Sequence, residues 1–214
     1  MIEIKNLCFS YTNKKPYNLN DVNLKIEEGS YLSVIGENGS CKTTLIKLIL
    51  GLLKPTSGEI AVNSKSIGYV PQRLDSFNSQ FPITVKEVLS CHKKTLNNNS
   101  IDTSSVLNTV NMGEYENRLL GMLSGGQQQR ILIARALMGN PDIIILDEPS
   151  TGVDSNNQKE IYDILCKLNK EEKKTIISIE HNIDIALNNS THILKIEDGK
   201  AYLYTTEEYK KVYK

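Results

Sequence analysis

The sequence predicts an α/β fold built on a mostly parallel sheet with a helical insertion. Short apolar runs alternate with helical patterns toward both ends of the chain, and this alternation is typical of a parallel sheet covered by helices. The run Ile143 to Leu146 is apolar at every position, as expected for a strand buried on both faces. Residues from about 72 to 140 have helical periodicity instead, which indicates the insertion.

The first 71 residues are expected to form strands around one helix. The expected strands cover residues 2–9, 22–26, 31–35, 59–62 and 66–70. A helix is expected from Lys42 to about Gly51, and Lys54 to Gly58 is expected to form a turn. Pro71 ends this part of the chain.

The insertion is expected to contain three helices. Thr84 is a candidate cap for a helix over Val85–His92, because its hydroxyl can accept a hydrogen bond from a free N–H of the first turn. A second helix is expected over Ser105–Met112, after a polar loop at Asn97–Ser100. Ser124 is expected to begin a longer helix that reaches about Met138.

Strands and helices alternate again after Pro141. The expected strands cover residues 142–146, 175–179, 192–196 and 200–204, and the expected helices cover 156–170, 183–188 and 206–212. The Asp198-Gly199 pair between the last two strands predicts a hairpin.

The composition argues against several classes of protein. The 214 residues suffice for one domain with a core, and 25 Lys and Arg balance 25 Asp and Glu. Such a chain has no overall charge to attract nucleic acid, so no nucleic-acid partner is expected. No apolar run is long enough to span a membrane, and Met1 to Lys5 alternates like a strand rather than a signal peptide. The four scattered cysteines suit a reduced cytosolic protein and argue against a disulfide scaffold or a zinc site.

A phosphate-binding loop is predicted between the strand at 31–35 and the helix from Lys42. The segment from Gly36 to Thr43 follows the pattern G-x-x-x-x-G-K-[ST] at every fixed position except Cys41. The backbone N–H groups of such a loop and the positive end of the helix surround an anion. The candidate nucleotide-binding residues are Gly36, Asn38, Gly39, Ser40, Cys41, Lys42, Thr43 and Thr44. The alternative is a turn that binds nothing.

Three side chains of this loop have expected contacts with a nucleotide. Lys42 is expected to reach the β- and γ-phosphates, Thr43 to bind Mg²⁺, and Thr44 to reach the α-phosphate.

Cys41 stands where the pattern has glycine. If this position needs a positive φ or close contact with phosphate, strain of about 1–3 kcal/mol follows. ATP affinity would then fall roughly 5- to 150-fold. The leading hypothesis is therefore a weakened nucleotide site that still binds. A second hypothesis is redox control, because a thiol at a helix N-terminus beside Lys42 is expected to be reactive.

Two carboxylates directly follow the buried strand. Ligands bind at the carboxyl ends of the strands in parallel sheets. Asp147 is therefore expected to hold Mg²⁺ through its water shell, and Glu148 to polarise an attacking water. The alternative is a strand followed by an acidic helix cap.

A second anion site is predicted at Ser124-Gly125-Gly126-Gln127. A hydroxyl and two unhindered N–H groups stand at a helix start, where the helix dipole favours an anion. Two glycines disfavour a helix, so an ordinary cap explains them poorly. The alternative is a capped helix with a glycine hinge.

With Leu123-Ser-Gly-Gly-Gln-Gln-Gln-Arg130 between the loop and the acid pair, the chain resembles the ATP-binding subunits of ABC transporters along essentially its whole length. The resemblance implies a P-loop NTPase of the ABC ATPase type, with a mostly parallel core sheet, an antiparallel β subdomain and a helical insertion subdomain. A single domain would cover residues 1–214. Residues 1–71 and about 141–214 would form the nucleotide-binding core and β subdomain, and residues of about 72–140 the helical subdomain.

The resemblance also implies roles for four further residues. Tyr11 would stack on adenine, although a half-buried tyrosine of the sheet is the alternative. Gln72 would touch Mg²⁺ and the attacking water, and His181 would contact the γ-phosphate. Asp154 would lie at the nucleotide-bearing interface of a dimer. The residues flanking His181, Glu180 and Asn182, depart from the Ser/Thr-His-Asp pattern of the family.

The resemblance implies a homodimer, or a pair with another ABC subunit, arranged head to tail. Each ATP, with Mg²⁺, would lie between the loop at 36–44 of one chain and Ser124–Gln127 of the other. ATP would close the dimer and hydrolysis would open it, with the motion passed to integral membrane permease subunits. The chain would be cytoplasmic, on the inner face of the cell membrane, and would dock its permease through the helical insertion and the loop after Gln72.

Three segments look like those of subunits that serve zinc or manganese uptake, namely Tyr69–Arg73, Phe77–Val85 and Glu148–Asp154. Because such an ATPase does not touch the cargo, no residue identifies the metal, and cobalt/nickel or iron-chelate importers stay open. A non-transport ABC ATPase and a hydrolysis-impaired partner that completes a neighbouring site stay open as well. The chain shows no coiled coil, duplicated cassette or basic surface, which argues against a non-transport ATPase.

Overall fold

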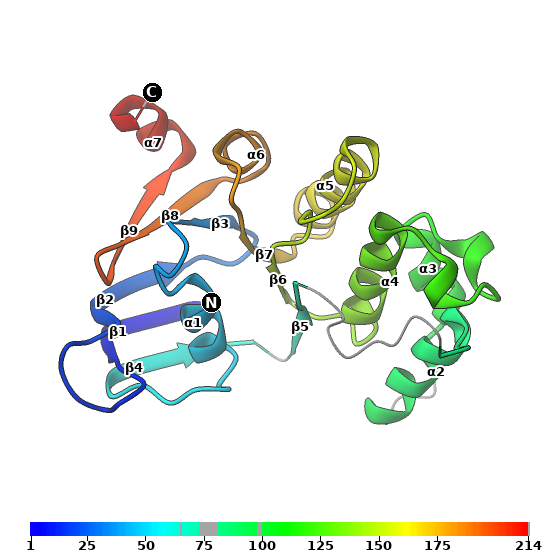
Figure 1. Cartoon of the computed structure of the whole chain (residues 1–214), viewed down its shortest axis with the longest axis horizontal. Helices are drawn as coiled ribbons and strands as arrows, with labels where there is room; N and C mark the ends of the chain where they lie inside the picture. The colour runs from blue at the N-terminus through cyan, green and yellow to red at the C-terminus, as the bar shows by residue number, and fades with distance from the viewer. Residues whose placement is uncertain (65, 73–80, 98–99, 214) are drawn as a thin grey trace.

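The computed structural model describes residues 1–64, 66–72, 81–97 and 100–213. Its strands are β1 (Ile2–Phe9), β2 (Leu19–Ile26), β3 (Tyr31–Ile35), β4 (Ser57–Val62), β5 (Ile67–Val70), β6 (Ile143–Asp147), β7 (Thr175–Ile179), β8 (His192–Glu197) and β9 (Lys200–Thr205). Its α-helices are α1 (Lys42–Ile49), α2 (Val85–Thr95), α3 (Thr103–Thr109), α4 (Gly125–Leu137), α5 (Ser155–Lys170), α6 (Ile183–Asn189) and α7 (Thr206–Tyr213). In Figure 1 the strands of the small sheet and α1 lie on one side of β6 and β7, and α2, α3 and α4 lie on the other.

The small sheet has the order β2-β1-β4 and is antiparallel. Its apolar side chains alternate with exposed polar ones, so one face is buried and the other meets solvent. The strand expected from Val22 begins earlier, because Leu19 pairs with Phe9 and is completely buried. The polar residues between Leu19 and Val22 concealed this start.

The large sheet has the order β5-β6-β7-β3-β8-β9. Its neighbouring strands are parallel except for the antiparallel pair β8 and β9, so the expectation of a mostly parallel sheet is confirmed. Asp198 and Gly199, between β8 and β9, have φ values of 49° and 73°. Two successive positive φ angles are what a tight hairpin turn requires, so the predicted hairpin is also confirmed.

Both faces of the large sheet are buried at its central strands β3, β6 and β7. Along β6, Ile143 and Ile145 pack with α1 and the small sheet, whereas Ile144 and Leu146 pack with residues of α4 and α5. Because successive side chains of a strand point to opposite faces, a strand between two cores must be apolar at every position. The prediction from the run Ile143 to Leu146 is confirmed.

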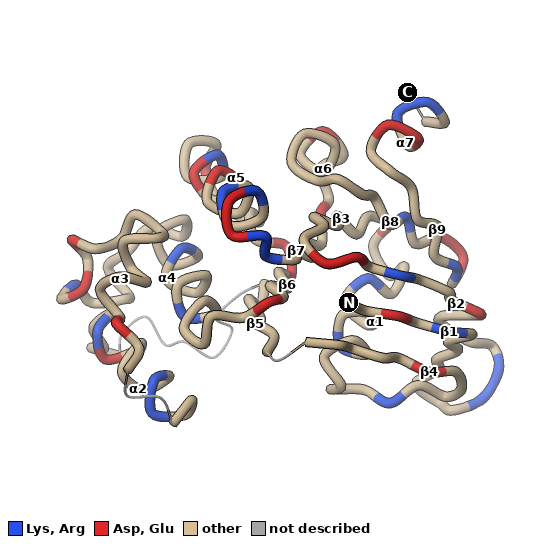
Figure 2. Tube along the Cα trace, turned by 180° about the vertical axis from the view of Figure 1, so that it is seen from behind, with Lys and Arg blue, Asp and Glu red and all other residues tan. Residues whose placement is uncertain are grey.

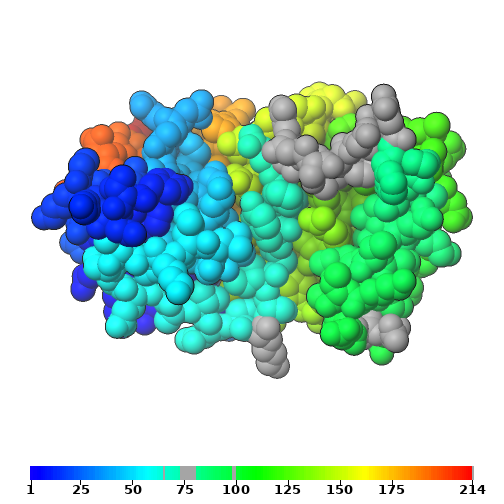
Figure 3. All heavy atoms as spheres, turned by 60° about the horizontal axis from the view of Figure 1, so that its bottom comes forward, coloured from blue at the N-terminus to red at the C-terminus, as the bar shows by residue number. Residues whose placement is uncertain are grey.

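Helices α2, α3 and α4 lie between β5 and β6 in the chain and gather on one side of the molecule, where α2 and α3 are green in Figure 3. Thr84 caps α2 as predicted, in a capping box with Glu87. The helix expected over Ser105–Met112 was wrong at both ends. It begins at Thr103, because Asp102 caps it, and it stops at Thr109 before Asn111 takes a φ of 56°.

The surface carries acidic and basic residues close to one another. In Figure 2 the two colours intermix along α5 and over the small sheet. Within the described ranges, none of the helices is both long and apolar enough to cross a membrane. Arg73, the segment Phe77–Gln80, the loop directly after Gln72 and the pair Asn98-Asn99 lie outside the described residues.

Candidate functional site

The predicted phosphate-binding loop connects β3 to α1. Gly36 and Gly39 have φ values of 154° and 84°, which favour glycine. A Cβ on Gly36 would come within 2.5 Å of the carbonyl oxygen of Ile196 and 2.6 Å of the Ser40 hydroxyl. The Ser40 hydroxyl is buried and has no hydrogen-bond partner among the described residues. The loop is thus closely packed and holds a polar group that a ligand could satisfy.

Cys41 lies in the left-handed region, with φ 74° and ψ 24°. It occupies the N-cap position of α1 without a side-chain cap, and its Sγ lies 3.7 Å from the carbonyl oxygen of Gly39. A side chain in this region costs about 1–3 kcal/mol relative to glycine. The condition for strain at this position is therefore met, while its effect on ATP affinity stays a prediction.

Lys42 folds back onto the loop. Its Nζ donates to the carbonyl oxygens of Gly36, 2.8 Å away, and Glu37, 2.9 Å away. The residue is buried, and burial lowers the pKa of its ammonium. The negative charges of Glu148 and Asp147 act in the other direction and raise this pKa, but by less. The ammonium is thereby held at the mouth of the loop, where a phosphate would meet it.

Thr43, in the first turn of α1, lies against Asp147 at the end of β6. The Thr43 hydroxyl donates to Oδ1 of Asp147 at 3.3 Å. Burial raises the pKa of Asp147, the charge of Glu148 raises it further, and the Thr43 hydrogen bond opposes both. A hydroxyl and a carboxylate are hard oxygen donors, so the pair fits Mg²⁺. Thr43, Asp147 and Gln72 would hold the ion.

The three predicted catalytic residues meet at one carboxylate. Oε1 of Glu148 lies 2.5 Å from Nε2 of His181, and Oε2 accepts from Nε2 of Gln72 at 2.5 Å. Thr151 also donates to Oε2, at 3.0 Å, and sequence reasoning did not anticipate this contact. Glu148 has a φ of 53°, a conformation that few non-glycine residues adopt and that often marks a functional position.

These residues meet because their strands are neighbours. Gln72 follows β5, Glu148 follows β6 and His181 follows β7, and the three strands lie side by side and parallel. The carboxyl ends of parallel strands share one edge of the sheet, which is where ligands bind in this class of fold.

The two residues that flank His181 have separate structural roles. Asn182 caps α6 by accepting hydrogen bonds from the backbone N–H groups of Asp184, at 2.9 Å, and Ile185, at 3.3 Å. Glu180 is buried and accepts hydrogen bonds from Ser178 and Tyr162. Sequence reasoning noted Glu180 only as a departure. A carboxylate directly after an apolar strand was the available signal, whereas nothing local pointed to Tyr162.

Ser124 is the N-cap of α4 and forms a capping box with Gln127. Gly125 is exposed, whereas Gly126 is buried against α5, where an added Cβ would lie 2.4 Å from Cβ of Asn157. The glycine at this second position therefore has a packing reason. In Figure 1, α4 and α1 stand on opposite sides of β6 and β7, so one chain does not bring its two predicted anion sites together.

Asp154 caps α5 next to α4. Its carboxylate accepts from the backbone N–H groups of Asn156 and Asn157 at 3.2 Å and 3.1 Å. The side-chain amide of Asn157 also donates to it, at 2.7 Å. This side-chain bond lowers the pKa of Asp154 most, and the backbone bonds lower it further.

Tyr11 lies beyond the end of β1 with 61% of its surface exposed. Its hydroxyl lies 2.9 Å from Oγ1 of Thr44, and its ring meets Phe9 edge-on at a centroid distance of 4.9 Å. It is therefore not the half-buried sheet tyrosine that was the alternative. Its ring stands beside the loop and has an exposed face.

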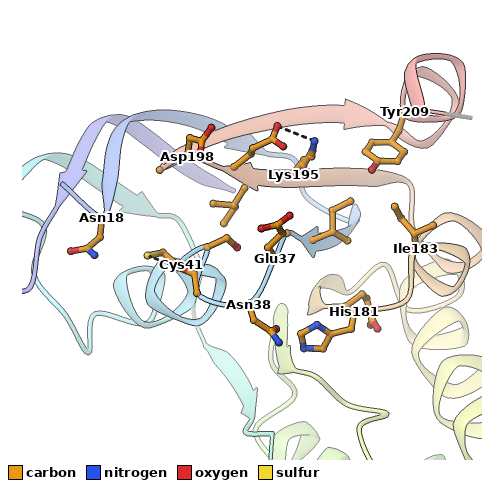
Figure 4. A pocket seen from close by; sticks show the side chains of 17 residues that line it. Asn18, Glu37, Asn38, Cys41, His181, Ile183, Lys195, Asp198 and Tyr209 are labelled. Atoms are coloured by element: carbon orange, nitrogen blue, oxygen red, sulfur yellow. Dashed lines mark hydrogen bonds and ion pairs between the residues drawn. The ribbon is translucent and has the colours of Figure 1, made fainter. Parts of the chain in front are cut away.

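A cavity of about 660 Å³ adjoins the loop on the side of β8. Figure 4 shows Asn38 and His181 pointing toward each other at one edge of it, with Cys41 near Asn18 and with Ile183 toward Tyr209. The phosphate-binding loop therefore borders open space as well as the carboxylates of β6.

Comparisons with known proteins identify the family of the chain. The family model described as ABC transporter matches residues 19–151. The chain is 43% identical over 207 residues to a Treponema pallidum protein named "Probable metal transport system ATP-binding protein", covering 96% of this chain and 87% of that one. It is 39% identical over 226 residues to the zinc uptake system ATP-binding protein ZurA of Listeria innocua, covering 95% and 87%.

A solved structure is also similar. It is a dimeric ATP-binding cassette in a post-hydrolysis state with bound ADP and phosphate, and the two chains have a TM-score of 0.78 and 29% identity over 96% of this chain and 99% of that one. The chain belongs to the ABC transporter family and is an ATPase of the type that forms its ATP-binding subunits.

Proposed function

We propose that this chain is the ATP-hydrolysing subunit of an importer for a divalent metal ion such as zinc or manganese. The observation that carries the hydrolytic role is the meeting of Gln72 and His181 at the carboxylate of Glu148, beside the pair Thr43 and Asp147. This set combines a candidate base, two polar groups that orient it and oxygen donors for a cation.

Each residue has a proposed task in hydrolysis. The Lys42 ammonium gives up its hydrogen bonds to the carbonyl oxygens of Gly36 and Glu37 and contacts the β- and γ-phosphates instead. Glu148 accepts a hydrogen bond from the attacking water and directs it at the γ-phosphorus. His181 and Gln72 release the Glu148 carboxylate and turn toward the γ-phosphate and the water. Bound Mg²⁺ would neutralise phosphate charge.

The assembly is proposed to be a head-to-tail dimer. The separation of α4 from α1 within one chain supports this, because Ser124, Gly125, Gly126 and Gln127 then need a second chain to supply the phosphates they are proposed to bind. Asp154 and the rest of the loop after Glu148 would lie at the same interface. The exposed face of Tyr11 suits an adenine ring.

The metal cargo and the membrane location are supported by the relatives. Proteins named for zinc uptake and metal transport are similar to this chain over nearly its full length. A permease in the cell membrane would then be the partner that passes the metal, with this chain on its cytoplasmic face.

The hydrolytic role is tested by the ATP turnover of the purified chain, with Glu148→Gln as the blank and Cys41→Gly alongside. Turnover above the blank supports the proposal. Turnover of Cys41→Gly alone would identify the native chain as a hydrolysis-impaired partner. If neither hydrolyses ATP although both bind it, the assay is repeated with the permease, and inactivity there refutes the hydrolytic role.

The cargo is tested by uptake of radioactive zinc and manganese into cells that carry the chain with its permease. Matched cells carry Glu148→Gln, which removes the proposed base and keeps the shape of the side chain. Equal uptake of every divalent metal by the two strains would refute the importer role. It would not bear on the conclusion that the chain is an ATPase.

A further inference from the structure

A buried series of hydrogen bonds connects the end of β7 to the loop that follows Glu148. The carboxyl of Glu180 accepts from the hydroxyls of Ser178 and Tyr162, the latter at 2.6 Å. The Tyr162 hydroxyl also lies 3.0 Å from Oγ of Ser150. When Glu180 is ionised, Tyr162 gives it its one proton, and Ser150 is then the donor of the last hydrogen bond.

Burial of the Glu180 carboxyl is unfavourable in free energy. Glu180 is 3% exposed and Tyr162 is 4% exposed. Burying a carboxylate is unfavourable even when it is hydrogen-bonded, and an apolar residue of similar size often gives a more stable protein. Packing alone does not explain a glutamate here, whereas a fixed geometry between Glu180 and the Ser150 loop would.

The bonds form one side of a closed ring. Glu180 precedes His181, and Ser150 stands two residues after Glu148 (150 − 148). His181 and Glu148 contact each other directly at 2.5 Å. The end of β7 and the loop after β6 are therefore joined twice, once through the proposed catalytic pair and once through Tyr162.

We propose that Glu180 is a positioning residue for ATP hydrolysis, which acts through Tyr162 and Ser150 to hold the Glu148 loop in place relative to His181. The inference rests on the roles proposed for Glu148 and His181. A loop tied on both sides resists small shifts, and a displacement of about 1 Å in a catalytic group can cost on the order of 10²-fold in rate.

The titratable groups that face Glu180 come from four elements. They are Tyr162 of α5, Tyr31 of β3, His181 after β7 and Glu148 after β6. Burial raises the pKa of Glu180 to about 7, the charge of Glu148 adds to this, and Ser178, Tyr162 and His181 oppose it. The carboxyl therefore changes its charge near neutral pH. The ionised form can only accept the hydrogen bond from Tyr162, whereas the protonated form can also donate one.

Two conservative variants test the proposal. Tyr162→Phe removes the bridging hydroxyl and keeps the ring, so kcat is expected to fall roughly 5- to 50-fold with the KM for ATP within about twofold. Glu180→Gln keeps the shape and one oxygen acceptor, so kcat at pH 6 is expected to stay within about threefold, while the part of the pH dependence of kcat between pH 6 and 8 that comes from Glu180 is lost. The double variant is expected to be no slower than Tyr162→Phe alone, because both changes break one connection.

Tyr31→Phe is the matched control. Tyr31 is buried near the same carboxyl, but in the described structure its hydroxyl bonds to neither Glu180 nor Tyr162. Its loss is therefore expected to leave kcat unchanged. A kcat of Tyr162→Phe equal to that of the native chain, or an equal loss in Tyr31→Phe, would overturn the proposal.

A second measurement separates this inference from the proposed function. Amide hydrogen exchange of residues 150–154 reports how firmly the loop is held, without any turnover. Faster exchange in Tyr162→Phe but not in Tyr31→Phe supports the connection through Tyr162, even if the native chain proves inactive. Inactivity of the native chain would count against the proposed hydrolytic role and not against this connection. Unchanged exchange in both variants overturns the inference.

Discussion

His181 and Glu148 contact each other through Nε2 and Oε1 at 2.5 Å, each from the loop just beyond the end of its own strand. Their strands, β7 and β6, are adjacent and parallel, so both side chains emerge at the same edge of the sheet. The contact occupies one oxygen of Glu148, and Gln72 and Thr151 occupy the other. We infer that the carboxylate is engaged until a nucleotide draws these donors away.

Removing His181 is expected to lower the rate without removing nucleotide binding. His181→Ala should reduce kcat roughly 10²- to 10³-fold, because the Glu148 carboxylate loses a polar partner and the γ-phosphate loses its proposed one. ATP affinity, measured by fluorescence of a nucleotide analogue, should change by less than about threefold. His92→Ala on α2 is the control, and an equal loss of turnover there would contradict the assignment.

Replacing Cys41 by glycine is expected to stabilise the chain. At φ 74° a glycine has no steric penalty, so Cys41→Gly should raise the free energy of unfolding by about 1–2 kcal/mol in urea titrations and tighten ATP binding. Cys41→Ala removes the thiol but keeps Cβ. It should therefore gain little, and an equal gain in both variants would show that the thiol and not the backbone is responsible.

The two glycines of α4 are expected to respond differently to alanine. Gly126→Ala would place Cβ 2.4 Å from Cβ of Asn157 and should destabilise the chain by about 1–3 kcal/mol. Among the described residues, an added Cβ on Gly125 would meet only the carbonyl oxygen of Gly152, at 3.7 Å. Gly125→Ala should therefore be neutral or slightly stabilising, because alanine favours a helix.

Turnover gives a second comparison for the same pair. Because Gly125 is proposed to contact the phosphates bound by the partner chain, Gly125→Ala should lower turnover although it does not destabilise the fold. Thermal unfolding and ATP turnover of the two variants check both parts, and full activity of Gly125→Ala would contradict the proposed contact.

Glu180 is expected to make stability depend on pH. Its pKa is raised from 4.5 to about 7, so the folded chain holds this proton more tightly than the unfolded chain does. The stabilisation is complete below the unfolded pKa and is lost as the pH rises through the folded pKa. The free energy of unfolding should therefore fall by roughly 1–3 kcal/mol between about pH 4.5 and 7 on account of this group.

Glu180→Gln isolates that contribution. Carboxylates with a lowered pKa, such as Glu87 and Asp154, have the opposite pH dependence and are present in both proteins. Urea titrations at several pH values should show the native chain losing stability relative to Glu180→Gln across this range. Parallel curves for the two proteins would show that Glu180 does not titrate there.

The parts of the site that lie within one short segment were predictable. The loop from Gly36 to Thr44 and the cap at Ser124 depend on residues close together in the chain, so their geometry follows from local backbone chemistry. The bounds expected for the helix at Ser105–Met112 were wrong although the signals that set them are also local. Asp102 caps the helix and Asn111 takes a positive φ after it, and both signals were overlooked.

By itself the sequence determined the element types, the phosphate-binding loop and the identity of the chemical groups at the strand ends. Only the tertiary structure decided which strands are neighbours, and hence that Gln72, Glu148 and His181 meet at one edge. It also decided that Glu180 bonds to Tyr162 in a buried position. The physical reason is that local backbone preferences act over a few residues, whereas strand order and buried hydrogen bonds depend on how distant segments pack together.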